Sequence, residues 1–94
     1  MVRPAAGLEI TAAFDWYEGQ SPGLGCGFLR AVDAVLASIL RSPALYAVVR
    51  GRTRRALLRR FPYGVFYYER DDEVVVVAVV HSRQDPERWQ VRAE

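Results

Sequence analysis

Apolar residues near the start of the chain recur at helical spacing. They occupy positions i, i+4, i+7 and i+11, namely Ala6, Ile10, Ala13 and Tyr17. Residues at this spacing share one helical face, so the pattern predicts a helix over residues 5–19 with a buried stripe. Pro4 fits this assignment, because proline is tolerated in the first turn of a helix. We interpret the aromatic residues Phe14, Trp16, Tyr17 and, further on, Phe28 as core.

A second helix is predicted from about Gly23 to Arg41. Its buried face also has helical spacing and comprises Phe28, Val32, Leu36 and Ile39. Ser21 and Pro22 suit the N-cap and the first helical position. Ser42-Pro43 ends the helix, because the residue before a proline disfavours helical backbone.

From Tyr46 onward the pattern changes to that of strands. Four strands are predicted, over residues 47–49, 54–61, 64–70 and 73–80, and aromatic and β-branched residues concentrate in the last two of them. The unbroken apolar run from Val74 to Val80 is typical of a central strand buried on both faces. A short helical turn is predicted over residues 85–92, and Trp89 within it is expected to pack back over the sheet.

This order of elements predicts an α+β fold. Short connections between strands require antiparallel pairing. The two helices must bury their stripes against one face of the sheet, which gives a helical hairpin on a three- or four-stranded antiparallel sheet. The 94 residues correspond to a single domain.

Composition narrows the cellular context. Hydrophobic residues make up 51% of the chain, enough for a core. Cys26 is the sole cysteine, so no internal disulfide can form and no oxidising compartment is required. The first residues do not resemble a signal peptide, and no apolar stretch approaches the roughly 20 residues that span a bilayer. We therefore expect a cytoplasmic protein without membrane association.

Positive charge is concentrated rather than large. The net charge is +2, and all 13 basic side chains are arginine, which is typical of a GC-rich genome. That bias does not explain the clustering of Arg50, Arg52, Arg54, Arg55, Arg59 and Arg60. Arg50, Arg52 and Arg54 have period-two spacing, so on one strand they would project from the same face and could follow a phosphate backbone.

Several motifs resemble one protein family in order and spacing. They are Trp16-Tyr17-Glu18 after an alanine-rich helix, Pro22-Gly23-Leu24-Gly25, Arg60-Phe61-Pro62-Tyr63, and His81-x-Arg83-x-Asp85-Pro86-x-x-Trp89. Together they cover nearly the whole chain. The sequence resembles the RelE/ParE toxins of bacterial type II toxin–antitoxin (plasmid stabilisation) modules, on the ParE side.

The resemblance implies a toxin that a co-encoded ParD-like or RelB-like antitoxin neutralises in a hetero-oligomer. ParE-like members poison DNA gyrase, whereas RelE-like members cut mRNA on the ribosome. Fold alone does not decide between these targets. An inactive relic that only binds antitoxin is a third possibility.

The chain departs from the family at its start. Members usually begin with a β-strand, but only Met1-Val2-Arg3 precede Pro4 here. A missing strand would leave a sheet edge unpaired, so we expect another chain to fill that edge.

His81 and Arg83 are the candidate catalytic residues if the protein is a nuclease. Histidine titrates near neutral pH and suits acid–base work, and an arginine can hold a phosphate. RelE-like nucleases typically add lysines and a C-terminal tyrosine, and this chain has no lysine and no tyrosine after Tyr68. We therefore favour a structural His81, hydrogen-bonded to Asp85 or to a carbonyl, and gyrase inhibition without catalysis.

Candidate partner- or target-binding residues lie in the arginine cluster and the following strand. They are Arg50, Arg52, Arg54, Arg55, Arg59 and Tyr68. Charge clusters are most often solvated or partner-facing, so these arginines fit contacts with an acidic antitoxin or with the target. Tyr67 and Tyr68 point to opposite faces of their strand, and we expect one of them on an open face. No Cys/His cluster or glycine-rich phosphate motif is present, so no metal or cofactor is expected.

Overall fold

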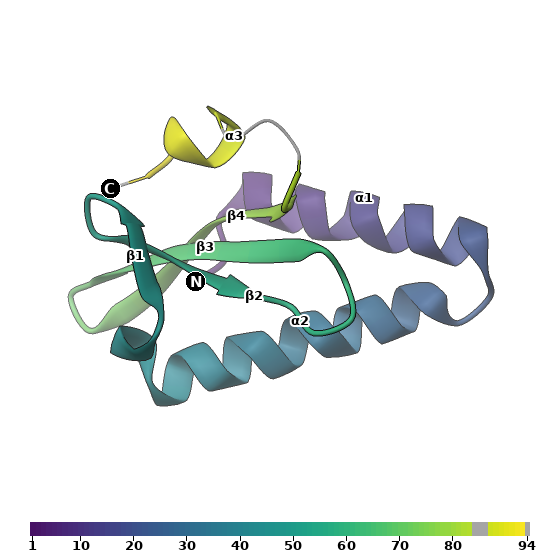
Figure 1. The fold of residues 1–94 in the computed structure, drawn as a ribbon, viewed down its shortest axis with the longest axis horizontal. Coiled ribbons are helices and arrows are strands. Elements are labelled where there is room, and N and C mark those ends of the chain that lie inside the picture. Colours follow the sequence, from purple (N-terminus) through teal and green to yellow (C-terminus); the bar gives the residue numbers. More distant parts are fainter. Residues whose placement is uncertain (84–86, 94) are drawn as a thin grey trace.

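Two helices cover one face of a four-stranded sheet in the computed structural model, which describes residues 1–83 and 87–93 (Figure 1). The elements are α1 (Pro4–Gln20), α2 (Leu24–Arg41), the 3-10 turn η1 (Pro43–Leu45), β1 (Ala47–Arg50), β2 (Thr53–Leu57), β3 (Tyr63–Arg70), β4 (Glu73–His81) and α3 (Glu87–Gln90). The predicted α+β class, with a helical hairpin on a small antiparallel sheet, is confirmed. The C-terminal helical turn is shorter than predicted, and its expected start at Asp85 lies outside the described residues.

Glu18 joins the two helices. Its carboxylate accepts the backbone N–H groups of Gly23 and Gly25, each at 2.9 Å, and thereby caps the start of α2. The predicted N-cap at Ser21 is wrong, because Gly23 takes that position with a left-handed φ of 88°. Gly25 is also required, since a Cβ there would lie 2.8 Å from atoms of Phe14.

The sheet is an antiparallel meander in the order β1-β2-β3-β4. The second strand ends at Leu57, earlier than the predicted 61, and Arg60 follows with a φ of 70°. The register shifts where Phe66 pairs with Ala78 but Tyr67 pairs with Val76, which leaves Val77 as a bulge. As a result Val77 and its neighbour Ala78 both join the apolar cluster on the face away from the helices.

The helix-side core contains a group of packed aromatic rings. Phe28 is fully buried and lies 5.4 Å from the Tyr17 ring and 5.5 Å from the Phe61 ring, measured between centroids. Tyr67, also buried, donates its hydroxyl to the Pro43 carbonyl at 2.6 Å, and burial raises its pKa to about 12. This core therefore fixes the helices and η1 against the sheet.

The opposite face of the sheet is covered as well. Tyr68 is only 1% exposed, so the expectation of an open face there is wrong. Arg52 lies over the Tyr68 ring at 4.9 Å, and Arg3 donates to its hydroxyl at 2.6 Å. Trp89 stacks on Phe66 at 4.5 Å, which confirms that it packs back over the sheet.

The outer edge of β4 is occupied by this chain's own residues. Met1 and Arg3 bracket Val76 with backbone hydrogen bonds of 2.8 and 3.0 Å, and Val2 forms a parallel bridge with it. The expected central strand is therefore last in the order of named strands, although it is buried on both faces as predicted. The expectation that another chain fills this edge is wrong for Val74–Val76, because the N-terminal stub pairs there.

Beyond the stub, an ion pair takes the place of a strand. Glu9 accepts the Val79 N–H at 3.0 Å, and Arg92 donates to the Val77 carbonyl at 2.8 Å. The two side chains also pair with each other at 3.0 Å and are only 14% and 25% exposed. We call Glu9 and Arg92 the edge clamp. The clamp satisfies backbone groups that would otherwise offer a pairing edge to another chain.

Replacing Arg92 by alanine should destabilise the fold by about 1–3 kcal/mol, because it removes the cation beside the mostly buried Glu9 carboxylate and the donor of the Val77 carbonyl. Urea unfolding followed by circular dichroism measures this loss. Arg70→Ala is the control, since its pair with Asp71 spans 4.0 Å in exposed surroundings and should contribute little. Equal stability of the two variants would contradict a stabilising clamp.

Candidate functional site

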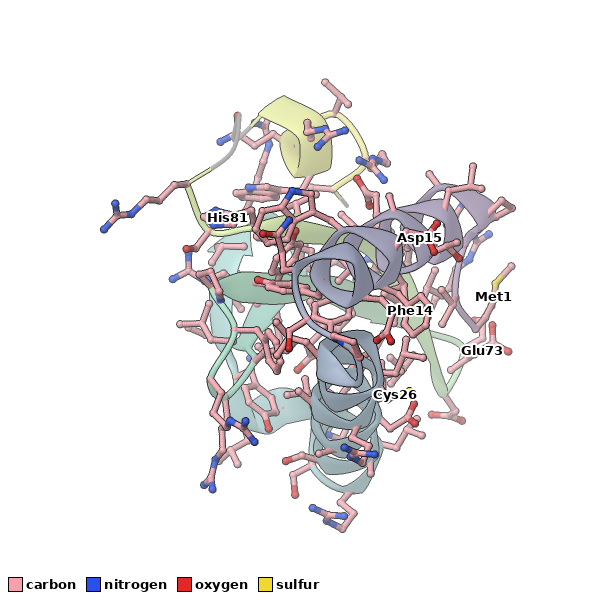
Figure 2. The ribbon with its side chains drawn as sticks, turned by 90° about the vertical axis from the view of Figure 1, so that its right-hand side faces the viewer. Met1, Phe14, Asp15, Cys26, Glu73 and His81 are labelled. Carbon is pink, nitrogen blue, oxygen red and sulfur yellow. The ribbon has the colours of Figure 1, made fainter. Side chains whose placement is uncertain are left out.

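His81 ends β4 and is held from two sides. Its Nδ1 accepts the backbone N–H of Arg83 at 3.0 Å, and its ring packs edge-on against Tyr63 at 5.4 Å. Tyr63 is also its partner in the β3–β4 register. Figure 2 looks along the two helices and shows His81 on the side of the sheet, far from Cys26 on α2. The hydrogen-bond partner of Nδ1 is thus a backbone amide, and the suggested partner Asp85 lies outside the described residues.

His81 lines a cavity of about 140 Å³ beside Trp89. Arg55 and Ser82 line the same cavity, so one candidate arginine does approach the histidine. The described lining residues include no carboxylate. Burial raises the pKa of the neighbouring Tyr63 phenol, which keeps it protonated near neutral pH and unsuited to act as a base.

In a neutral imidazole, the nitrogen that accepts a hydrogen bond cannot carry the proton. Because Nδ1 of His81 accepts from Arg83, Nε2 carries the proton in the neutral ring. The Nε2–H group of His81 could therefore donate a hydrogen bond to a ligand. Nδ1 must lose its hydrogen bond from the Arg83 amide before it can act as a base. Arg83 itself is exposed, and its backbone rather than its guanidinium contacts His81.

The arginine cluster does not form one track. Arg50 belongs to β1, Arg52 to the following turn and Arg54 to β2, so the expected projection from one strand face is wrong. The hairpin turn at Gly51-Arg52 is the reason, because it reverses the chain in the middle of the spacing. Two other candidates also separate, with Arg55 at the His81 cavity and Arg59 near α2.

Two candidates for partner binding are part of the folded domain's own structure. Arg54 donates to the carbonyls of Tyr46 and Ala44 at 2.6 and 3.2 Å and thereby braces the chain between η1 and β1. Tyr68 is buried beneath Arg52, so a partner cannot reach its ring unless that covering moves. Arg50, Arg55 and Arg59 remain exposed.

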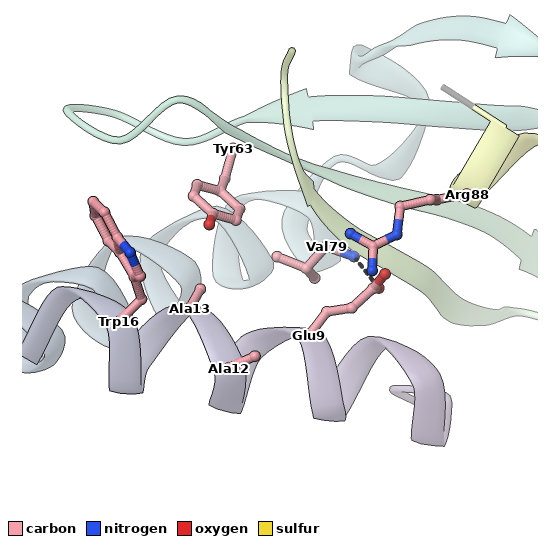
Figure 3. Close-up of a pocket in the computed structure, with 7 residues that line it drawn as sticks. All are labelled: Glu9, Ala12, Ala13, Trp16, Tyr63, Val79 and Arg88. Atoms are coloured by element: carbon pink, nitrogen blue, oxygen red, sulfur yellow. Dashed lines mark hydrogen bonds between the residues drawn. The ribbon is translucent and has the colours of Figure 1, made fainter. Parts of the chain in front are cut away.

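Trp16 lies outside the core, although it was predicted there, and Phe14 is only half-buried. Trp16 is 59% exposed, while Tyr17 beside it packs inward, because consecutive residues point to different sides of a helix. Trp16 overhangs a second cavity of about 230 Å³ between α1 and the end of the sheet (Figure 3). Figure 3 also shows Tyr63 and Arg88 at this cavity and Glu9 bonded to the Val79 amide.

The described residues contain neither a candidate metal cluster nor a helix suited to span a membrane. Within residues 1–83 and 87–93, no group of three or more histidine, cysteine or acidic side chains could hold a metal ion. None of the described helices is both long and apolar enough to cross a bilayer.

Comparison with known proteins identifies the family to which this chain is related. The family model for the ParE toxin of the type II toxin–antitoxin system parDE matches residues 1–86. The chain belongs to the ParE toxin family. A solved structure titled "Chromosomal ParDE TA system from P. aeruginosa" matches the fold with a TM-score of 0.64 and 14% identity, over 85% of this chain and 90% of that chain. No curated protein matches the sequence.

Membership in the ParE family confirms the resemblance inferred from the motifs. It also gives two motif residues a physical meaning that spacing did not reveal. Glu18 of the Trp-Tyr-Glu motif caps α2, and Gly25 of the Pro-Gly-Leu-Gly motif permits the close approach of α1. A glutamate shortly before a glycine-rich helix start was the available signal. No sequence signal indicated the edge clamp, because Glu9 and Arg92 are 83 positions apart.

If His81 is structural in this ParE toxin, His81→Ala should retain growth inhibition to within a few-fold. The substitution removes the contacts with Tyr63 and Arg83, so we expect a lower melting temperature instead. Growth of cells expressing the variant and thermal unfolding of the purified protein measure the two effects. A variant that is folded at the growth temperature but not toxic would overturn the structural role.

Trp89→Ala should lower stability by about 1–3 kcal/mol, because it removes the half-buried ring stacked on Phe66. Val91→Ala is the matched control on the same terminal segment, since Val91 is 82% exposed. Thermal unfolding of both variants measures the difference in stability. If the two melting temperatures equal that of the parent, Trp89 does not close the far face of the sheet.

Proposed function

We propose that this ParE toxin arrests growth by binding DNA gyrase stoichiometrically, without turning over a substrate. The observation that carries this proposal is the engagement of His81 by Arg83 and Tyr63 at a cavity whose described lining has no carboxylate. General acid–base catalysis needs groups free to exchange protons with the substrate. The sole histidine is instead braced within the fold, which supports inhibition by binding. We expect the protein to act in the cytoplasm.

We further propose that a ParD-like antitoxin neutralises the toxin in a hetero-oligomer. Exposed arginines at several places on the domain suit an acidic protein partner. Among the sequence candidates, Arg50, Arg55 and Arg59 are available for such contacts, and Arg52 is exposed while it also covers Tyr68.

Ribosome-dependent mRNA cleavage is the second candidate. Its support is the shared cavity of His81 and Arg55, which could place a hydrogen-bond donor, the Nε2–H group, beside a cation for the phosphate. Arg83 lies next to this cavity and could add a second cation. An inactive antitoxin-binding relic is the third candidate, and it requires no activity at the His81 cavity.

Titration of the purified protein into a gyrase supercoiling reaction tests the proposal. We expect inhibition at near-stoichiometric amounts, with accumulation of cleaved DNA, and its reversal by the co-encoded antitoxin. A parallel translation reaction with radiolabelled mRNA tests cleavage on the ribosome. Heat-unfolded protein is the control for non-specific effects of a basic chain.

The outcomes separate the candidates. Cleaved mRNA with unaffected gyrase, from protein whose circular dichroism shows it folded, would replace gyrase by the ribosome. No effect in either reaction, with retained antitoxin binding, would identify the relic.

A further inference from the structure

A groove runs along α2 on the helical side of the domain. Its two adjoining cavities have volumes of about 440 and 300 Å³ and share Ala31 and Arg59 as lining residues. One wall is α2, and the other is formed by Leu57 and the connection between β2 and β3. Figure 1 shows this connection passing beside α2. We call this feature the α2 groove.

The middle of the α2 groove is apolar. Ala31, Ala34 and Val35 line it from α2, and Leu57 lines the opposite side although 56% of its surface is exposed. The polar groups there satisfy each other, since the Ser38 and Tyr46 hydroxyls lie 2.6 Å apart. A partner that buries this surface therefore gains from apolar contact without leaving those hydroxyls unpaired.

The rim of the α2 groove is basic. Arg30, Arg41, Arg59 and Arg60 line it, and all four are exposed. The described lining includes no acidic residue, and no ion pair involves these four arginines in the part of the chain that the structure describes. The charge of the rim is thus left for a partner that carries carboxylates.

We propose that the α2 groove is the docking site of an acidic antitoxin segment, with apolar side chains on Ala34 and Leu57 and carboxylates at Arg41 and Arg59. This inference rests on the proposed neutralisation by an antitoxin and gives it a location. The groove lies between one helix and one strand end, dimensions that suit a single chain segment rather than the surface of a large folded enzyme. A second copy of this chain is disfavoured, because it would bring the same four arginines against these.

Binding of the full-length co-encoded antitoxin to matched variants tests the groove. Ala34→Gln places a longer side chain in the groove, whereas Ala37→Gln makes the same change at an exposed α2 position outside its lining. We expect at least tenfold weaker binding for the first and unchanged binding for the second, by isothermal titration calorimetry. Equal affinities of these two variants and the parent would overturn the proposal.

Charge is tested separately. The double variant Arg41→Gln/Arg59→Gln should weaken antitoxin binding at low salt and flatten its salt dependence. Arg70→Gln, at the far end of β3, is the control and should leave both unchanged. A parental salt dependence in the double variant would contradict pairing at the rim.

Two further measurements distinguish a failure of this inference from a failure of the proposed function. Gyrase inhibition by Ala34→Gln should match the parent, and loss of gyrase inhibition with retained antitoxin affinity would assign the groove to the target and overturn the proposal. If the parent protein itself does not bind the antitoxin, neutralisation fails and the proposed docking site fails with it. If the parent binds but every variant binds equally, only the groove is wrong.

Discussion

The outer edge of β4 is where distant parts of the chain are held together. The stub Met1–Arg3 pairs with one half of this edge, and Glu9 of α1 and Arg92 near the C-terminus satisfy the other half. Both chain ends and the first helix are therefore positioned by backbone groups of a single strand. A small domain buries only a modest share of its surface, so an edge closed from within contributes both stability and protection from unwanted pairing.

The helices and strands could be predicted because local patterns determine them. Helical spacing gave α1 and α2, and the apolar run from Val74 to Val80 gave β4 and its burial on both faces. The position of β4 in the sheet was not predictable in the same way. The outer neighbour of β4 is the stub Met1–Arg3, which pairs with Val76. A segment of three residues is too short to show the periodicity of a strand. The bulge at Val77 likewise arises from fitting β3 to β4 and has no marker within a uniform valine run.

The candidate site was predicted less well than the fold. His81 was correctly placed at a strand end, but its partners, Tyr63 and the Arg83 amide, follow from three-dimensional register and a local turn. Arginine spacing was misleading because a turn at Arg52 divides the cluster. Charge alone cannot tell a bracing arginine such as Arg54 from an exposed one such as Arg59, since both have the same side chain and the same strand-rich surroundings.

The Trp89 stack and the Arg92 clamp are two of the contacts that attach residues 87–93 to the domain. Neither contact involves the helix-side core, so this segment can lift away as a local opening event at a free-energy cost below that of global unfolding. The Val79 amide, bonded to Glu9 rather than to a strand, would share that opening when the clamp is released. Amide hydrogen exchange should therefore differ between the two halves of β4. The Val76 amide should be protected by the stub, and the Val79 amide should exchange at the rate at which the C-terminal segment opens.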